Sequence, residues 1–168
     1  MRERSRIGIV VSLILSIPDP RLSLVTPVQQ QTLALRSELA ELPRLVSFID
    51  DFFALLPADA GALNAFQLAL EEVVLNVINH GYHGETGHTI PVTLAVEDGH
   101  VLATVTDDAP AFDPLARPPV DINAPLEDRP IGGLGIHLVK KLMTNVTYER
   151  RDGRNILTLA RELRPELS

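Results

Sequence analysis

Cysteine is absent from this chain of 168 residues. Its absence excludes disulfide scaffolds, zinc–thiolate sites, iron–sulfur clusters and thiol nucleophiles. Tryptophan is also absent, tyrosine occurs twice, and 22 acidic residues outnumber 15 lysines and arginines, which gives a formal net charge of −7. Because a dedicated nucleic-acid binder usually has a basic surface and often stacking aromatic side chains, this composition argues against direct nucleic-acid binding. The apolar content of 45% predicts one globular domain with a proper hydrophobic core.

Long apolar runs are scarce, and the one near the N-terminus needs its own interpretation. Three arginines precede the apolar residues 7–17, as in a signal peptide, but no small-residue cleavage site follows them. A run of this length is too short to span a bilayer. We therefore expect residues 1–30 to be an N-terminal extension, either an added strand or an overextended start, with a signal peptide as the weaker alternative. Residues 31–168 are expected to form a single domain of a soluble, cytoplasmic protein with no membrane partner.

The first half of the domain is predicted to contain one strand and two helices. Residues 32–38 are typical of a short strand, and Pro43 opens a helix whose apolar residues recur at helical spacing. A second helix is predicted at about 60–79. We expect it to end at residues 80–84 (HGYHG), where glycine permits the left-handed conformation of a helix C-cap.

The second half is predicted to contain two β-hairpins separated by a third helix. Alternating apolar residues flank Asp98-Gly99 and again Asp152-Gly153, both strong two-residue turn sequences. Between the hairpins, residues 112–131 are rich in proline and lack periodicity, so they form either a functional lid or a flexible insertion. The order of elements predicts an α/β (α+β) two-layer sandwich, with a mixed, mostly antiparallel sheet and helices on one face.

Three polar features could carry chemistry. Glu72 and Asn76 share a face of the second helix, either as a pocket wall or as an ordinary surface pair. Asp107 ends a strand, where a carboxylate can accept the exocyclic amino proton of a purine or simply begin a turn. Gly133 and Gly135 open the third helix, where backbone N–H groups can meet phosphate, or where glycine gives a flexible entrance. Each feature is weak alone, but their order along the chain is specific.

In this order the segments resemble the GHKL (Bergerat-fold) ATPases, and more closely the bacterial anti-sigma-factor serine/threonine kinases. Residues 72–82 (EVVLNVINHGY) are similar to that family's N box. Residues 107–114 (DDAPAFDP) are similar to its D-x-G-x-x-F-D-P segment, and residues 131–138 (IGGLGIHL) to its G-x-G box. The resemblance covers roughly residues 33–163 and implies the Bergerat fold.

The resemblance also implies roles for the matching residues. Asn76 would ligate a Mg²⁺ ion that bridges the phosphates of ATP, and Asp107 would accept the adenine amino group. Glu72, four residues before the metal ligand, would be the catalytic base that orients or deprotonates the attacking hydroxyl.

Four further residues would bind the cofactor ATP by the same resemblance: Ala109, Gly133, Gly135 and Ile136. The two glycines would let backbone amides contact the phosphates. Ala109 stands where the family usually has glycine. Since alanine resists positive φ and would bring a methyl group toward the nucleotide, we expect this departure to weaken ATP binding modestly.

The function implied by the resemblance is that of an ATP-dependent protein serine/threonine kinase acting as an anti-sigma regulatory factor. Such a protein binds a sigma factor and phosphorylates an anti-anti-sigma protein, and it is expected to be a homodimer. Two alternatives stay open at this point. One is a non-catalytic, nucleotide-dependent module that sequesters a partner, and the other is an ATP-binding fragment of a sensor histidine kinase.

Overall fold

The structure is a computed structural model that describes residues 30–57, 60–116 and 134–163. A 3₁₀ turn at Leu39–Glu41 leads into the first helix, and a π-helical turn at Val77–Gly81 ends the second. In chain order the elements are β1 (Gln30–Arg36), α1 (Leu42–Phe53), α2 (Ala60–Asn76), β2 (Thr89–Glu97), β3 (His100–Asp107), α3 (Leu134–Leu142), β4 (Asn145–Arg151) and β5 (Arg154–Glu162).

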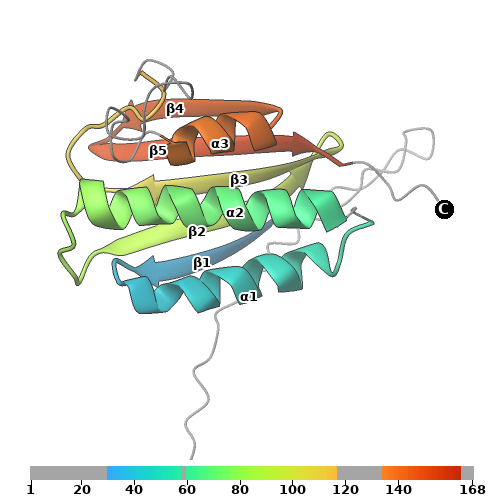
Figure 1. Ribbon diagram of the computed structural model, residues 1–168, viewed down its shortest axis with the longest axis horizontal. Coiled ribbons are helices and arrows are strands. Elements are labelled where there is room, and N and C mark those ends of the chain that lie inside the picture. The colour runs from blue at the N-terminus through green and yellow to red at the C-terminus, as the bar shows by residue number, and fades with distance from the viewer. Residues whose placement is uncertain (1–29, 58–59, 117–133, 164–168) are drawn as a thin grey trace, which may run out of the picture.

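The strands form one sheet in the order β1-β2-β3-β5-β4, and every neighbouring pair is antiparallel. All three helices lie on the same face of this sheet, with α2 between α1 and α3 (Figure 1). The predicted two-layer sandwich is therefore confirmed. The first strand lies two residues earlier than expected, because Ser37 leaves the ladder to hydrogen-bond with the loop before β2 through Glu85 and His88.

The core lies between the sheet and α2. Residues of the strands that face the helices alternate with residues on the other face, as expected for a sheet covered on one side. On β3 the inward row is Val101, Ala103, Val105 and then Asp107, and all four are buried. On β5 the inward row runs from Asn155 through Leu157 to Leu159. The two apolar rows therefore end in a carboxylate and an amide at the same end of the sheet, because Asp107 pairs with Asn155.

The C-terminal end of α2 differs from the sequence prediction. The α-helix stops at Asn76 and widens into a π-helical turn, in which Tyr82 N donates to Val77 O at 2.9 Å. Gly81 does not adopt positive φ; the left-handed residues are His83 and Gly84, at φ values of 54° and 79°. The left-handed glycine that was expected within residues 80–84 is therefore Gly84, whose backbone N–H donates to Ile78 O at 2.9 Å. A π-helical turn of this kind is frequent at functional sites.

Both predicted hairpin turns are confirmed. Asp98 and Gly99 have φ values of 47° and 75°, and Asp152 and Gly153 have φ values of 52° and 75°. Positive φ at both central residues is the geometry that fits the twist of two-residue hairpins.

Three predictions of the sequence concern residues outside the described ones: the N-terminal extension, most of the proline-rich residues 112–131, and Gly133. Within the described part of the chain, one continuous helical run, Ala60–Gly81, is long and apolar enough to cross a membrane by length and composition. In this fold that run is the central helix of the helical layer and packs on the sheet core (Figure 1).

Candidate functional site

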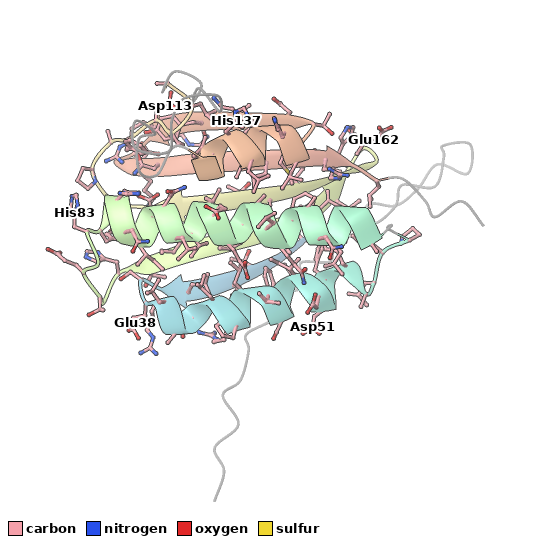
Figure 2. The ribbon with its side chains drawn as sticks, in the orientation of Figure 1. Glu38, Asp51, His83, Asp113, His137 and Glu162 are labelled. Carbon is pink, nitrogen blue, oxygen red and sulfur yellow. The ribbon has the colours of Figure 1, made fainter. Side chains whose placement is uncertain are left out.

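A cavity of about 480 Å³, including its open mouth, lies at the end of the molecule where α2, β3 and β5 meet. Figure 2 marks this end by His83, which follows α2, and Asp113, which follows β3; Asp51 and Glu162 lie at the opposite end. The cavity contains residues from all three motifs of the sequence. Its lining comprises Val73, Asn76, Val77, Gly81, Val105, Asp107, Pro110, Phe112, Pro114, Ile136, Tyr148, Asn155 and Leu157.

Three of the predicted site residues, Asn76, Asp107 and Ile136, line this cavity directly. Glu72 and Gly135 lie beside it and contact each other, and Ala109 lies behind its wall. The lining is mostly apolar, with a few polar groups among the aliphatic side chains. This combination is typical of small-molecule sites, in which apolar walls bind a ring system and a few polar groups orient it.

Asp107 is the buried carboxylate of the cavity. It is 7% exposed, and its Oδ1 atom accepts hydrogen bonds from Asn155 Nδ2 at 2.7 Å and from the Ala109 backbone N–H at 3.0 Å. Burial raises the pKa of this carboxyl above its usual range, although these two hydrogen bonds and the nearby Arg150 guanidinium act in the opposite direction. Among the described residues no donor reaches Oδ2, so that oxygen can accept a hydrogen bond from a ligand.

Asn76 contributes an amide to the same cavity from the last turn of α2. Its Nδ2 atom is buried and has no hydrogen-bond partner within the described part of the chain. Because the two ends of an amide are assigned from their partners, a half-turn about the last bond would put Oδ1 in the same place. The site therefore holds one buried amide atom without a partner among the described residues, and such an atom normally has a partner in a functional protein.

Glu72 precedes Asn76 by one helical turn and lies over the start of α3. A Cβ atom added to Gly135 would lie 2.2 Å from Glu72 Oε2, a distance that real Cβ atoms do not show. A methyl group at position 135 would therefore displace the Glu72 carboxylate, the far end of a flexible side chain. The absence of a side chain at 135 thus leaves room for this carboxylate, in addition to the contact with phosphate that the motif implies.

Ala109, which stands where the family usually has glycine, has a backbone conformation that is open to any residue. Its φ is not positive, and its side chain is 3% exposed and faces Gly81, where an added Cβ would meet the Ala109 methyl at 3.1 Å. The methyl group thus packs beside Gly81, which itself lines the cavity. The modest weakening of ATP binding that is expected from this alanine stays a prediction.

A second polar cluster, formed by Tyr82, His88 and Asp108, lies next to the end of β3. Tyr82 Oη donates to Asp108 Oδ1 at 2.6 Å and accepts from the Asp108 backbone N–H at 3.2 Å. The Tyr82 ring stacks on His88, with ring centroids 4.0 Å apart. The hydrogen bond from Tyr82 lowers the pKa of Asp108, and burial raises the pKa of Tyr82. These contacts hold the residue next to Asp107 in place.

The site also includes residues to which the sequence assigned no role in it: Asn155, Tyr148 and Gly81 in the lining and Tyr82 beside it. Asn155 could have been found only from the register of β3 and β5, which places it opposite Asp107. No group of three or more histidine, aspartate or glutamate side chains able to hold a metal is present among the described residues. A metal ion at this site would therefore depend on one protein ligand together with oxygens of a bound phosphate compound and water.

Comparison with known proteins gives a consistent result. The serine/threonine-protein kinase BtrW of Bordetella bronchiseptica is 30% identical over 99 residues, which cover 59% of this chain and 70% of BtrW. The serine-protein kinase RsbW of Bacillus cereus is 30% identical over 95 residues, which cover 54% of this chain and 59% of RsbW. The matched part therefore spans about three fifths of this RsbW.

The fold is also shared with a solved structure and with a family model. The crystal structure of the RsbU and RsbW domains of Rv1364c from Mycobacterium tuberculosis covers 83% of this chain, with a TM-score of 0.59 and 20% identity. The alignment covers 34% of that longer chain. The family model of the histidine kinase-like ATPase domain matches residues 35–161. This chain is thus a member of the histidine kinase-like ATPase domain family, the GHKL type of ATPase domain.

Proposed function

We propose that this protein is an ATP-dependent protein serine/threonine kinase that acts as an anti-sigma regulatory factor. In this function it binds a sigma factor, and it phosphorylates an anti-anti-sigma protein on a serine or threonine. The observation that carries the proposal is that the Asp107 carboxylate and the Asn76 amide line one cavity, with no partner for Asn76 Nδ2 in the described part of the chain. The names of the serine kinases BtrW and RsbW support the kinase activity.

The residues present fit ATP and Mg²⁺. The Oδ2 atom of Asp107 is an acceptor for the adenine amino group, and the apolar lining from Val105, Ile136 and Leu157 suits a purine ring. Asn76 can offer one amide oxygen to Mg²⁺, which keeps waters and phosphate oxygens as its other ligands. When bound, the metal neutralises charge on the phosphates during transfer.

Glu72 is the proposed catalytic base. In the proposed reaction Glu72 accepts the proton of the acceptor hydroxyl, whose oxygen bonds to the terminal phosphorus while the bond to the bridging oxygen breaks and ADP leaves. Glu72 has no hydrogen-bond or ion-pair partner among the described residues, so its carboxylate is available for this proton. Gly135 allows it to lie at the start of α3, where the family's phosphate-binding motif begins.

The proposal is tested first by calorimetric titration with Mg·ATP of the full chain and of the variants Asn76→Ala and Asp107→Ala. Saturable binding that both substitutions weaken by tenfold or more supports the nucleotide site. Absence of binding by the natural chain at millimolar ATP refutes the kinase proposal.

Phosphotransfer is then measured with radiolabelled ATP and an anti-anti-sigma protein, followed by identification of the phosphorylated amino acid. The matched variant is Glu72→Gln, which keeps the size of the side chain but cannot take up the proton. We expect it to bind ATP normally and to lose transfer by 10²-fold or more. If this variant transferred phosphate at the natural rate, the assigned base would be wrong. A chain that binds ATP and sequesters its partner without any transfer would instead be the non-catalytic module.

A further inference from the structure

The two edge strands of the sheet differ in how their edges are protected. The last three residues of β4 are Glu149, Arg150 and Arg151. Charges of this kind keep an exposed edge from pairing with another strand. β1 has the sequence QQTLALR, with no proline and with one charged residue, Arg36, at its last position. Along most of its length β1 therefore has an edge without such protection.

The hydrogen bonds at the end of β1 show which of its backbone groups face that edge. Ser37 N–H donates to His88 O at 3.0 Å, in the direction of β2. Arg36 N–H donates to Glu41 Oε2 at 3.3 Å, on the side away from β2. Because these directions alternate along an antiparallel strand, the backbone groups of the even-numbered residues of β1 point away from β2.

The open part of this edge is therefore formed by Gln30, Thr32 and Ala34. All three residues are exposed, and no other residue in the described part of the chain bonds to their outward N–H and C=O groups. The edge is closed at its far end, where the Arg36 carbonyl accepts from Glu38 N–H at 2.7 Å. The unpaired groups thus have room for one short strand that stops before Arg36.

Helix α1 lies alongside β1 (Figure 1) and leaves an aromatic ring half-buried on that side. Asp50 faces α2, because its Oδ1 atom accepts from Gln67 Nε2 at 2.6 Å. Phe48 precedes Asp50 by two residues, which places it about 200° around the helix, on the flank turned away from α2. It packs against the core but remains partly exposed. A strand added to the free edge of β1 would lie below this ring and bury it further.

The N-terminal residues 7–17 (IGIVVSLILSI) have the alternation that such a strand needs. Their odd-numbered members are all large aliphatic residues: Ile7, Ile9, Val11, Leu13, Leu15 and Ile17. Three of the even-numbered members are small or polar, namely Gly8, Ser12 and Ser16. β1 has the same division, with its leucines toward the helices and its threonine and alanine on the open face.

The position of this segment in the chain also favours pairing with β1. Residues 18–29 connect it to Gln30, and they include Pro18, Pro20 and Pro27, which suit a loop. A connection of this length reaches readily to a neighbouring strand. Because the segment is tethered, its effective concentration at the edge is far higher than that of a separate molecule.

We propose that residues 7–17 add to the sheet as a strand antiparallel to β1 along its free edge, with the odd-numbered side chains toward α1 and Phe48. The residues nearest the connection, 12–17, pair with residues 30–34. The inference is independent of the proposed kinase function. It gives the N-terminal extension a defined place, on the edge that the described residues leave open.

Pairs of introduced cysteines test the proposal in the full chain, which has no cysteine of its own. Thr32→Cys is combined with Ile14→Cys or Ser16→Cys, which the proposal places on the same face. It is also combined with Leu13→Cys or Leu15→Cys, which the proposal places on the opposite face. Residues opposite each other in paired strands lie at a distance that a disulfide spans. We therefore expect one of the even positions to cross-link within the chain about tenfold faster than either odd position.

The matched control uses the opposite edge of the sheet. Thr147 on β4 is also an exposed threonine, and strand register places it in the same transverse row of the sheet as Thr32. Thr147→Cys combined with Ser16→Cys should cross-link no faster than the odd-position pairs. A rate equal to that of Thr32→Cys would mean that the segment samples the whole surface, and it would overturn the inference.

Hydrogen exchange gives a second measurement without cysteines. Leu13→Asp puts a charge into the aliphatic row and should release the strand, so the amides of Thr32 and Ala34 should exchange about tenfold faster or more than in the natural chain. Ser12→Asp, one position away on the other face, should leave their exchange unchanged. Equal effects of the two substitutions would contradict the assigned faces.

Three other results would overturn the inference. A disulfide between two chains, seen as a dimer on a non-reducing gel, would show that a second copy occupies the edge. Absence of cross-linking in every pair would show that the segment lies elsewhere. Exchange of Thr32 and Ala34 in the natural chain at the rate of unpaired amides would show that the edge is open. None of these measurements uses ATP, so their failure is distinct from a failure of the proposed function.

Discussion

The contact between Gly135 and Glu72 leads to a prediction about catalysis that separates chemistry from binding. In Gly135→Ala the new methyl group would lie 2.2 Å from Glu72 Oε2. The carboxylate must therefore retreat by about 1 Å to reach ordinary van der Waals contact. A catalytic group displaced by this much loses on the order of 10²-fold in rate, or about 2.7 kcal/mol of transition-state stabilisation. The backbone tolerates the change, because position 135 is helical and does not have positive φ.

The assay is single-turnover transfer from ATP to the protein acceptor, with ATP affinity measured separately by calorimetry. We expect Gly135→Ala to transfer about 10²-fold more slowly and to bind ATP within about threefold of the natural chain. Gly61→Ala, at an exposed helical glycine in the first turn of α2, is the matched control and should leave both values unchanged.

A double-mutant cycle tests whether the effect of Gly135→Ala acts through Glu72. Glu72→Asp withdraws the carboxylate by one methylene and makes room for the methyl group at 135. The double variant Glu72→Asp/Gly135→Ala should therefore be about as active as Glu72→Asp alone. Two results would refute the claim that a methyl group at 135 displaces the catalytic carboxylate. One is phosphotransfer at the natural rate in Gly135→Ala, and the other is a loss of ATP affinity large enough to account for the slower transfer.

Three further predictions concern stability and pH. Asn155→Ala leaves buried donors and acceptors unpaired and should lower the free energy of unfolding in urea by about 3 kcal/mol, whereas Asn145→Ala, at an exposed asparagine on β4, should change it by less than about 0.5 kcal/mol; equal effects would contradict the hydrogen bonds of Asn155. Tyr82→Phe removes the hydrogen bond that lowers the pKa of Asp108, so NMR titration should show that pKa rising toward its usual range; an unchanged value would contradict the contact. Burial raises the pKa of Asp107, so the folded state holds its proton to higher pH than the unfolded state does, and stability from this group falls as pH rises through that window. ATP affinity needs the carboxylate and should fall as pH decreases into the same window, a dependence that calorimetry should find missing in Asp107→Asn once the nucleotide's own titration is subtracted.

Most elements of the fold are predicted by local patterns in the sequence. The Asp-Gly pairs identify both hairpins because two-residue turns need positive φ, a strictly local requirement. The two long helices are predicted from helical spacing and from Pro43, a residue suited to the first turn. The end of α2 is not predicted, because a π-helical turn depends on what the strand end and the following loop contact.

In the candidate site, too, residues within local motifs were predicted and a residue that depends on strand pairing was not. Asn76, Asp107 and Ile136 were expected on motifs and do line the cavity, since each motif is a short continuous segment. Asn155 was not expected, because its role depends on pairing with a strand 48 positions earlier in the chain. Alternation along β5 indicates its inward face but cannot say that its neighbour is a carboxylate.

The contact between Gly81 and Ala109 has a consequence for how this family can diverge. The extra methyl group at 109 occupies the volume that is vacant at 81, so the two positions form a size-matched pair. While alanine stands at 109, larger residues at 81 are disfavoured, because the Cβ atoms would approach within 3.1 Å. A change of residue 109 to glycine removes that restriction. Substitutions at the two positions should therefore be accepted in a preferred order during evolution, with 109 becoming smaller before 81 becomes larger.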